Sequence, residues 1–254
     1  TVEQWDGTNW TEIGALVTAT AFGSNSPVGT TTAGLIAGGL ISGGAFSAIN
    51  QVWNGSSWSD QNELNEGRAY CAGLGTTTAA LEIGGQPSGP TFGNKVEQWD
   101  GSSWTEISEF NTSRARGTAG GTTTSALFYA GCVGPSSTAN ANTEFWNGSS
   151  WTEIADLSTA RMRGGGGGSL ASAILAGGDT GPGPHTTATE EWSAPATFNQ
   201  IQQGQLFFNS TTNAFKETIV DIPGATWASG PTLGTARYYL AGVGNPSNAL
   251  VFGG

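Results

Sequence analysis

Tryptophans recur along this chain in pairs, at intervals that barely change. The first members of the pairs are Trp5, Trp53, Trp99, Trp146 and Trp192, separated by 48, 46, 47 and 46 residues. Four of them have a partner five residues further on: Trp10, Trp58, Trp104 and Trp151. A period of this length marks one supersecondary unit repeated in tandem, and such units become stable by stacking on their neighbours. The repeat therefore restricts the chain to an array of similar modules.

Each unit reads as four short β-strands. In the second unit, segment 68–76 is rich in small residues, and the apolar segment 78–85 ends in a glycine pair. Segments 95–99 and 102–107 alternate polar and apolar residues around Asp-Gly, a strong hairpin signal. The 41 glycines and the charged fraction of only 11% suit a chain with many turns. Sheets stacked radially around an axis bury one another's faces, so we predict an all-β propeller.

The last unit departs from the pattern by an insertion. Trp192 has no partner five residues on, but Trp227 lies ten residues before Arg237, the spacing of a second tryptophan in the other units. We therefore assign residues 193–222 as an insertion between the two outer strands of this unit, and segment 205–219 predicts a β-hairpin.

The two ends of the chain are complementary. The sequence begins with a pair of outer strands and finishes with a pair of inner strands. We expect these strands to pair, closing residues 1–254 into one domain with five blades of four strands each. The sequence begins without Met, so we expect a processed chain or part of a longer one.

Charged and small residues share the same period. Arginine recurs at Arg68, Arg114, Arg161 and Arg237, with Thr20 in the first unit. Glutamate recurs at Glu3, Glu97, Glu144 and Glu190, with Gln51 in the second unit. Small pairs recur at Gly38–Gly39, Gly84–Gly85, Gly131–Cys132 and Gly177–Gly178. Because the two charged sets are nearly equal in number, we interpret them as one buried Arg–Glu pair per blade. The alternative is a ring of arginines that binds an acidic ligand.

The order of these elements resembles the kelch repeat, a β-propeller family. The shared features are an arginine, an apolar strand, Gly-Gly, Val-Glu-x-aromatic, a turn and Trp-Thr-Glu-Ile, and they extend over almost the whole chain. Trp99 stands where kelch units usually have tyrosine, and the turn is shorter. The sequence of the repeats also resembles tandem kelch-like arrays in virion proteins of marine bacteriophages. Segment 205–219 is similar to a hairpin common in phage tail and fibre proteins. The resemblance implies a kelch-like fold and a place on a virion.

Composition argues against several classes of function. A net charge of −11 with only eight Lys and Arg disfavours nucleic acid and anionic membranes as partners. No apolar run is long enough for membrane insertion. The one histidine, His185, is expected to be a solvated loop residue, which argues against multi-histidine metal sites and histidine-based triads. Cys71 and Cys132 are interpreted as buried thiols. We predict no catalytic residue, no metal and no cofactor.

We therefore expect a non-enzymatic protein of the virion surface or extracellular space, which serves host attachment or particle decoration. Expected partners are other virion chains and a host glycan or receptor, and the protein could form a homo-oligomer. The inserted segment is too apolar for a solvent-exposed loop. We therefore predict that it binds a neighbouring chain through Leu206, Phe207, Phe208 and Phe215. Two alternatives stay open: a secreted or cell-surface bacterial adhesin or lectin, and a hydrolase or lyase with carboxylates on a propeller face.

Overall fold

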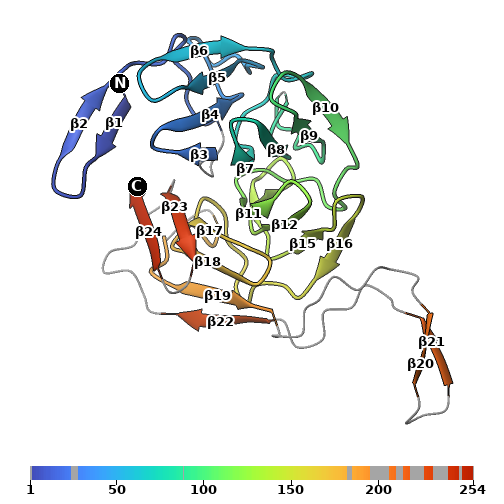
Figure 1. The fold of residues 1–254 in the computed structure, drawn as a ribbon. Helices are drawn as coiled ribbons and strands as arrows, with labels where there is room; N and C mark the ends of the chain where they lie inside the picture. Colours follow the sequence, from blue (N-terminus) through green and yellow to red (C-terminus); the bar gives the residue numbers. More distant parts are fainter. Residues whose placement is uncertain are drawn as a thin grey trace.

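The structure, a computed structural model, describes residues 2–23, 28–87, 89–181 and 185–194; beyond residue 194 it describes only strands β20 to β24. Every regular element in this part of the chain is a β-strand (Figure 1), which confirms the all-β prediction. The same residues include no helix with the length and apolar character needed to cross a membrane.

Sixteen strands form four antiparallel sheets of four strands each. Within each sheet the strands follow one another in chain order, so that every sheet is a meander, as the repeat predicts. The first two sheets are β3 (Val28–Thr30), β4 (Ala33–Ala37), β5 (Asn50–Trp53), β6 (Trp58–Gln61) and β7 (Ala72–Thr76), β8 (Ala79–Ile83), β9 (Val96–Trp99), β10 (Trp104–Ile107). The other two are β11 (Thr118–Thr122), β12 (Ser125–Tyr129), β15 (Thr143–Trp146), β16 (Trp151–Ile154) and β17 (Gly165–Gly168), β18 (Ser172–Ala176), β19 (Thr189–Ser193), β22 (Thr226–Gly230).

Four further strand pairs are separate two-stranded sheets. One belongs to a loop of the third sheet, one to the inserted segment, and two to the ends of the chain. They are β13 (Cys132–Val133) with β14 (Thr138–Ala139), β20 (Leu206–Asn209) with β21 (Ala214–Glu217), β1 (Val2–Trp5) with β2 (Trp10–Ile13), and β23 (Leu240–Asn245) with β24 (Asn248–Gly253).

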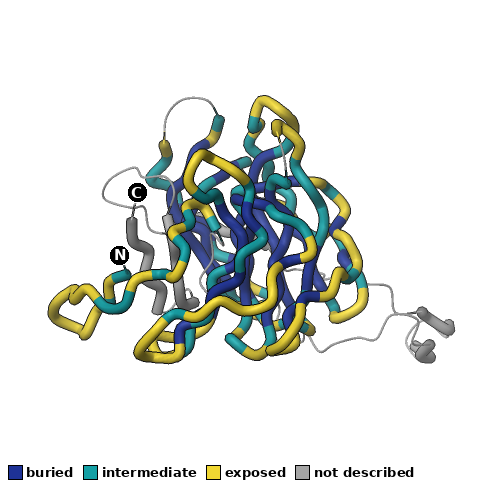
Figure 2. Tube along the Cα trace, turned by 90° about the horizontal axis from the view of Figure 1, so that it is seen from above, coloured by how far each residue is buried: buried dark blue, intermediate teal, exposed yellow. Residues whose placement is uncertain are grey.

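The sheets are arranged around an axis in the manner of a β-propeller. In Figure 1 the strands β3, β7, β11, β17 and β23 lie innermost, and each contacts the next one in this order. In Figure 2 buried strands fill the middle of the body, and exposed turns and loops lie toward its ends. The small residues of the inner strands allow this convergence, since a Cβ on Gly120 of β11 would lie only 2.9 Å from the backbone nitrogen of Gly168 in β17.

The predicted number of blades is wrong. The structure has four four-stranded sheets, not five, and the terminal hairpins β1–β2 and β23–β24 are not joined into one sheet. The second and third strands of each complete sheet are connected by a loop of 12 or 13 residues. Strands β24 and β1 lie at opposite ends of the sequence instead, so pairing them requires closing a loop of the whole chain at a larger entropic cost.

The hydrophobic core is divided into clusters that lie between neighbouring sheets. Trp99 and Trp104 of the second sheet pack with Val28, Leu35 and Ala37 of the first. The third sheet packs on the second through the equivalent tryptophans, and Trp192 of the fourth sheet packs on the third. Each sheet therefore depends on its neighbour for burial, as expected for stacked repeats.

The paired tryptophans lie directly opposite one another on the two outer strands. Trp99 is the cross-strand partner of Trp104, and their ring centroids are 5.4 Å apart. Their side chains are 1% and 6% exposed, which confirms that this pair is buried. In the fourth sheet Trp192 lies opposite Trp227, although residues 194–225 separate β19 from β22. A large cross-strand aromatic contact therefore recurs at the outer edge of the first three complete sheets.

The N-terminal hairpin has the same tryptophan pair without the same burial. Trp5 lies opposite Trp10 with ring centroids 5.7 Å apart, but these residues are 43% and 54% exposed. The hairpin thus has the local geometry of a blade edge, but its two tryptophans are more exposed than Trp99 and Trp104.

The third unit shows that one small pair was placed wrongly in the sequence. Gly84 donates a backbone hydrogen bond to Lys95, and the equivalent bond in the third sheet comes from Ala130. The pair is therefore Ala130–Gly131, not Gly131–Cys132. Ala130 has a φ of 61° and so occupies the left-handed region where the other sheets use glycine. The loop that follows is one residue longer, which compensates for the shift in the sequence.

Candidate functional site

The recurring arginines and glutamates form buried ion pairs within the sheets. Arg68 pairs with Glu97 at 3.0 Å, Arg114 with Glu144 at 2.5 Å, and Arg161 with Glu190 at 2.5 Å. All six side chains are at most 3% exposed. These three pairs confirm the structural interpretation. They contradict the alternative of a ligand-binding ring at these three positions, because the guanidinium groups cannot reach solvent. The side chain of Arg237 is outside the described residues.

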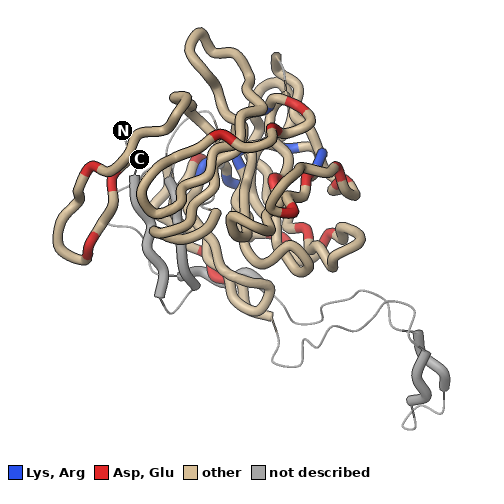
Figure 3. Tube along the Cα trace, turned by 45° about the horizontal axis from the view of Figure 1, so that its top comes forward, with Lys and Arg blue, Asp and Glu red and all other residues tan. Residues whose placement is uncertain are grey.

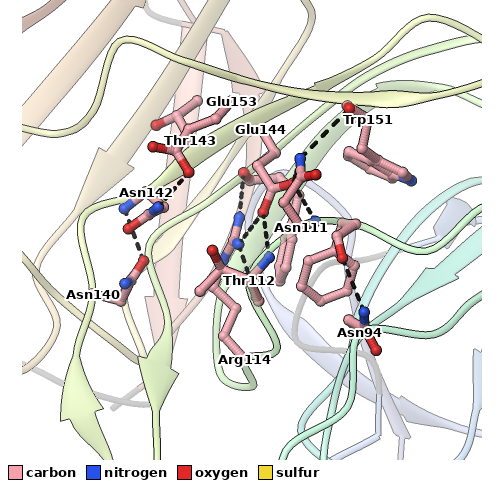
Figure 4. Close-up of polar contacts among 12 residues, drawn as sticks. Asn94, Asn111, Thr112, Arg114, Asn140, Asn142, Thr143, Glu144, Trp151 and Glu153 are labelled. Carbon is pink, nitrogen blue, oxygen red and sulfur yellow. Dashed lines mark hydrogen bonds and ion pairs between the residues drawn. The ribbon is translucent and has the colours of Figure 1, made fainter.

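The pair of the third sheet shows what these charges do (Figure 4). The Glu144 carboxylate accepts hydrogen bonds from the backbone and side-chain nitrogens of Asn111, both at 2.7 Å. Arg114 donates to the carbonyl oxygens of Phe128 at 3.0 Å and Ala130 at 3.1 Å. The pair therefore fixes the loop that enters the sheet and satisfies carbonyl groups at the end of β12. Burial lowers the pKa of Arg114, and the nearby Glu144 opposes that shift.

The first sheet has a neutral version of the same contact. Gln51 accepts backbone hydrogen bonds from Val17 at 2.8 Å and Thr18 at 3.3 Å, and its amide nitrogen donates to the Thr18 carbonyl at 2.8 Å. Thr20 occupies the position of the arginine. Loss of the cation is thus matched by loss of the carboxylate, so that no unpaired charge is buried.

The outer turns are organised by the residue that follows the first tryptophan. The Asp100 carboxylate accepts the backbone N–H groups of Ser102 and Ser103, each at 2.8 Å. These hydrogen bonds, chiefly that from Ser103, lower the pKa of Asp100 to about 2. Asn147 accepts the equivalent bonds from Ser149 and Ser150, each at 2.9 Å. The motif is therefore a side-chain-capped turn in which Asp and Asn serve equally well.

A different set of residues has the properties of a site at the centre of the ring. Two positions after Thr20 and after each recurring arginine of the next three units, a large residue adopts a left-handed backbone conformation. The residues are Phe22, Tyr70, Arg116 and Arg163, with φ between 54° and 61°. Non-glycine residues are uncommon in this region, and such outliers concentrate at functional sites. We call these four the axial residues, because Tyr70, Arg116 and Arg163 stand two positions before an innermost strand.

The axial residues are joined by their backbones from one sheet to the next. The amide of Tyr70 donates to the Phe22 carbonyl at 2.7 Å, Arg116 donates to Tyr70 at 2.9 Å, and Arg163 donates to Arg116 at 3.0 Å. The left-handed conformation turns each peptide group toward the neighbouring sheet. Backbone bonds alone therefore link the four positions, which leaves their side chains free to differ.

The side chains of three axial residues stack on one another. The rings of Phe22 and Tyr70 have centroids 5.0 Å apart, and the Arg116 guanidinium lies 4.5 Å from the centroid of Tyr70. Arg116 also donates to Ser137 at 2.7 Å and lies 5.8 Å from the ring of Phe92. Phe22 is 42% exposed, while Tyr70 and Arg116 are partly buried. The stack therefore combines aromatic faces with a cation at a solvent-accessible position.

Arg163 is neutralised by a carboxylate. It contacts Asp179 at 2.8 Å, and the opposite oxygen of Asp179 contacts Nδ1 of His185. The Asp179 side chain is only 3% exposed, whereas that of His185 is 38% exposed. His185 is therefore exposed, as expected of a loop residue, but it also contacts a buried carboxylate, which the sequence did not predict.

Arg116 differs from every other described cation in its partners. Each of the other lysines and arginines whose side chains the structure describes has an ion pair with a carboxylate: Arg68, Lys95, Arg114, Arg161 and Arg163. Arg116 has no such ion pair; its Nε is buried without a hydrogen-bond partner, a feature that it shares with Arg68 and Arg161. A guanidinium has five N–H donors, of which only those on Nη1 are used here.

The two cysteines are buried free thiols, as predicted. Burial raises the pKa of Cys71 well above its ordinary value, and the nearby carboxylate of Glu82 raises it further. Burial also raises the pKa of Cys132, although Arg116 opposes this shift. Neither thiol therefore has the low pKa of a reactive nucleophile. Within the described ranges, no group of three or more His, Cys, Asp or Glu residues could hold a metal ion.

No protein-family model and no curated protein matches this sequence. The structure shows a propeller-like arrangement of the sheets, and the likeness to kelch repeats stays a prediction from the residues. The apolar residues predicted to bind a partner lie on the hairpin β20–β21, where Phe208 is opposite Phe215 in register. The side chains of Leu206, Phe207, Phe208 and Phe215 fall outside the described residues, so their role stays a prediction.

The axial residues were not identified from the sequence, because the sequence predictions rest on residue types that recur in every unit. Arg116 and Arg163 occur in "RARG" and "RMRG", where the first arginine recurs and the second does not. A charge at a position that is aromatic in other units is itself a signal, since the scaffold does not require it. The positive φ could not be read from the sequence, because these units have no glycine there.

Proposed function

We propose that this protein is a non-enzymatic binding protein that presents a propeller-like ring for attachment to a surface. The axial residues carry the proposal, because they combine a cation without a carboxylate partner and stacked aromatic rings at one solvent-accessible place. The repeated ion pairs and tryptophans stabilise the fold. The axial residues have side chains that the fold itself does not require, so they are the candidate for a binding function. Binding to a surface requires such side chains and no reactive group.

We further propose that the attachment takes place at the surface of a bacteriophage particle, with a glycan or receptor of the host as the partner. The support is the resemblance of the repeats to kelch-like arrays in phage virion proteins. The strongly acidic composition suits an exposed role, and Figure 3 draws Asp and Glu on outer turns and hairpins around the ring. Capsid or tail genes beside the gene for this protein would support the phage assignment, and genes for secretion or cell-wall attachment would support a bacterial adhesin.

The inserted segment supplies the other surface that the proposal needs. We propose that residues 193–222 dock the ring to a neighbouring virion chain through Leu206, Phe207, Phe208 and Phe215. Two short strands alone are marginally stable in water, and this hairpin is rich in apolar residues. Replacing residues 193–226 by the Asn-Gly-Ser-Ser turn of residues 147–150, which gives Trp192 and Trp227 the five-residue spacing of the other pairs, should preserve folding and abolish assembly onto the particle. Loss of host binding with intact assembly would show that the two surfaces are reversed.

The proposed function is tested by labelling the purified protein and measuring its retention on bacterial cells and envelope polysaccharides by flow cytometry. We expect saturable retention on at least one surface, competed by unlabelled protein. Heat-denatured protein is the control for non-specific adhesion. Retention on no surface, or retention that the denatured protein reproduces, would contradict an attachment role.

A further inference from the structure

We infer that Arg116, together with the aromatic rings of Tyr70 and Phe22, binds a saccharide that carries a carboxylate. The inference rests on the proposed function and specifies the ligand of the same site. It begins from the charge at the centre of the ring. Arg163 is neutralised by Asp179, whereas Arg116 donates only to Ser137 and Cys132. The axial cluster therefore has one uncompensated cation.

The form of that cation favours a carboxylate. A guanidinium presents parallel N–H groups that match the two oxygens of a carboxylate. The hydrogen bonds of Arg116 use Nη1, at 2.7 Å to Ser137 Oγ and 3.6 Å to Cys132 Sγ, so Nη2 has no partner among the described residues. Stacking on Tyr70 at 4.5 Å and the bond to Ser137 hold the group in one orientation. A fixed guanidinium loses less side-chain entropy when it binds an anion than a mobile surface lysine does.

The aromatic neighbours favour a sugar ring as the rest of the ligand. Phe22 is 42% exposed, and its ring continues the stack formed by Tyr70 and Arg116. The negative face of an aromatic ring attracts polarised C–H groups, which a sugar presents on one side of its ring. An anionic sugar can thus place its carboxylate on Arg116 and its C–H groups against the exposed part of Phe22.

The remaining charges argue against a polyphosphate ligand. A nucleic acid needs several cations along its backbone, and this cluster has one. The whole chain has a net charge of −11, which repels a polyanion. A saccharide with a single carboxylate can pair with Arg116, and because it carries only one negative charge it is repelled less by the acidic residues of the protein than a polyanion is.

The test uses an array of glycans that bear uronate or sialate groups, each printed beside its methyl-ester counterpart. The best binder is then measured by calorimetry with the full chain. We expect binding to the free carboxylates, at least tenfold weaker binding to the esters, and at least tenfold weaker binding by Arg116→Gln. Lys95→Gln is the matched control, because it removes a cation that lies outside the axial cluster and pairs with Glu66 and Glu106.

The outcomes separate this inference from the proposed function. Equal binding of acids and esters, or full affinity of a folded Arg116→Gln variant, would overturn the carboxylate assignment and leave surface attachment standing. Absence of binding to every glycan and every cell surface would remove both. Arg116→Lys keeps the charge and loses the paired N–H groups, so it should recover only part of the affinity. If Arg116→Gln fails to fold, Phe22→Ala tests the stacking half, and unchanged affinity in that variant would also overturn the inference.

Discussion

Exchange of the ion pair in the third sheet for its neutral counterpart in the first tests how the buried charges contribute to stability. Arg114→Thr leaves the Glu144 carboxylate buried without a cation, which costs about 3–5 kcal/mol in the free energy of unfolding. Glu144→Gln leaves the Arg114 guanidinium buried without an anion, at a similar cost. Combined, the two changes reproduce the Thr20 and Gln51 arrangement of the first sheet, which buries no charge.

The double variant should therefore cost no more than Arg114→Thr alone. Some destabilisation remains, because the carbonyl groups of Phe128 and Ala130 lose the N–H donors of Arg114, at about 1–3 kcal/mol for each unsatisfied group. The amide oxygen introduced by Glu144→Gln would still accept the backbone N–H of Asn111, as Gln51 accepts that of Val17. We expect the two single changes to be coupled by about 3 kcal/mol, whereas independent sites would be additive.

The assay is urea unfolding followed by tryptophan fluorescence, applied to the wild type, both single variants and the double variant. The exposed pair of Lys95 and Glu106 provides the control cycle, since its side chains are 39% and 46% exposed. Its coupling should stay below about 1 kcal/mol. Coupling of the buried pair should persist in 1 M salt, because buried charges are screened little. Additivity of Arg114→Thr and Glu144→Gln within about 0.5 kcal/mol would refute this reasoning.

Three further outcomes follow from the same geometry. Trp104→Ala should cost roughly 3–5 kcal/mol in urea unfolding, whereas Trp10→Ala, at the equivalent but 54% exposed position, should cost far less; equal costs would contradict burial as the cause. Ala130→Gly should stabilise the protein by about 1 kcal/mol, because Ala130 has a φ of 61°, and a loss of stability would show that its Cβ contributes packing. The pKa of Asp100 lies below its ordinary value of 3.8, at about 2, so its stabilising contribution is present above pH 4 and lost as the pH falls toward 2. NMR titration should give this value, and Asp100→Asn should remove that part of the pH dependence; an ordinary pKa would mean that the turn is not capped as described.

Much of the architecture could be predicted because the units repeat. Strand positions, the tryptophan pairs and the assignment of Trp227 follow from spacing, since each observation recurs several times. The same reasoning predicted the Arg–Glu pairs, because two sets of opposite charge at one period require each other when buried. Periodicity is informative wherever burial imposes the same demand on every unit.

The features that the sequence did not predict are those in which one unit differs from the rest. The repeat predicts a fifth blade made of the two ends of the chain, but the pattern of repeated residues carries no information about the entropy cost of joining distant ends. The third small pair was misplaced because Ala130 replaces a glycine and the next loop is longer by one residue. His185 pairs with Asp179, and none of the first three units has a charged residue at the position of Asp179.

The backbone bridges between the axial residues also bear on how such a protein can evolve. Main-chain atoms hold neighbouring units together there, and the φ angles of Phe22, Tyr70, Arg116 and Arg163 agree within 7° although the side chains differ. A mutation at one of these codons can therefore change the chemistry of the centre while the joints between repeats stay intact. A lineage under pressure to recognise new surfaces could exchange these four residues one at a time, and divergence among its descendants should concentrate at these positions more than at the neighbouring arginines.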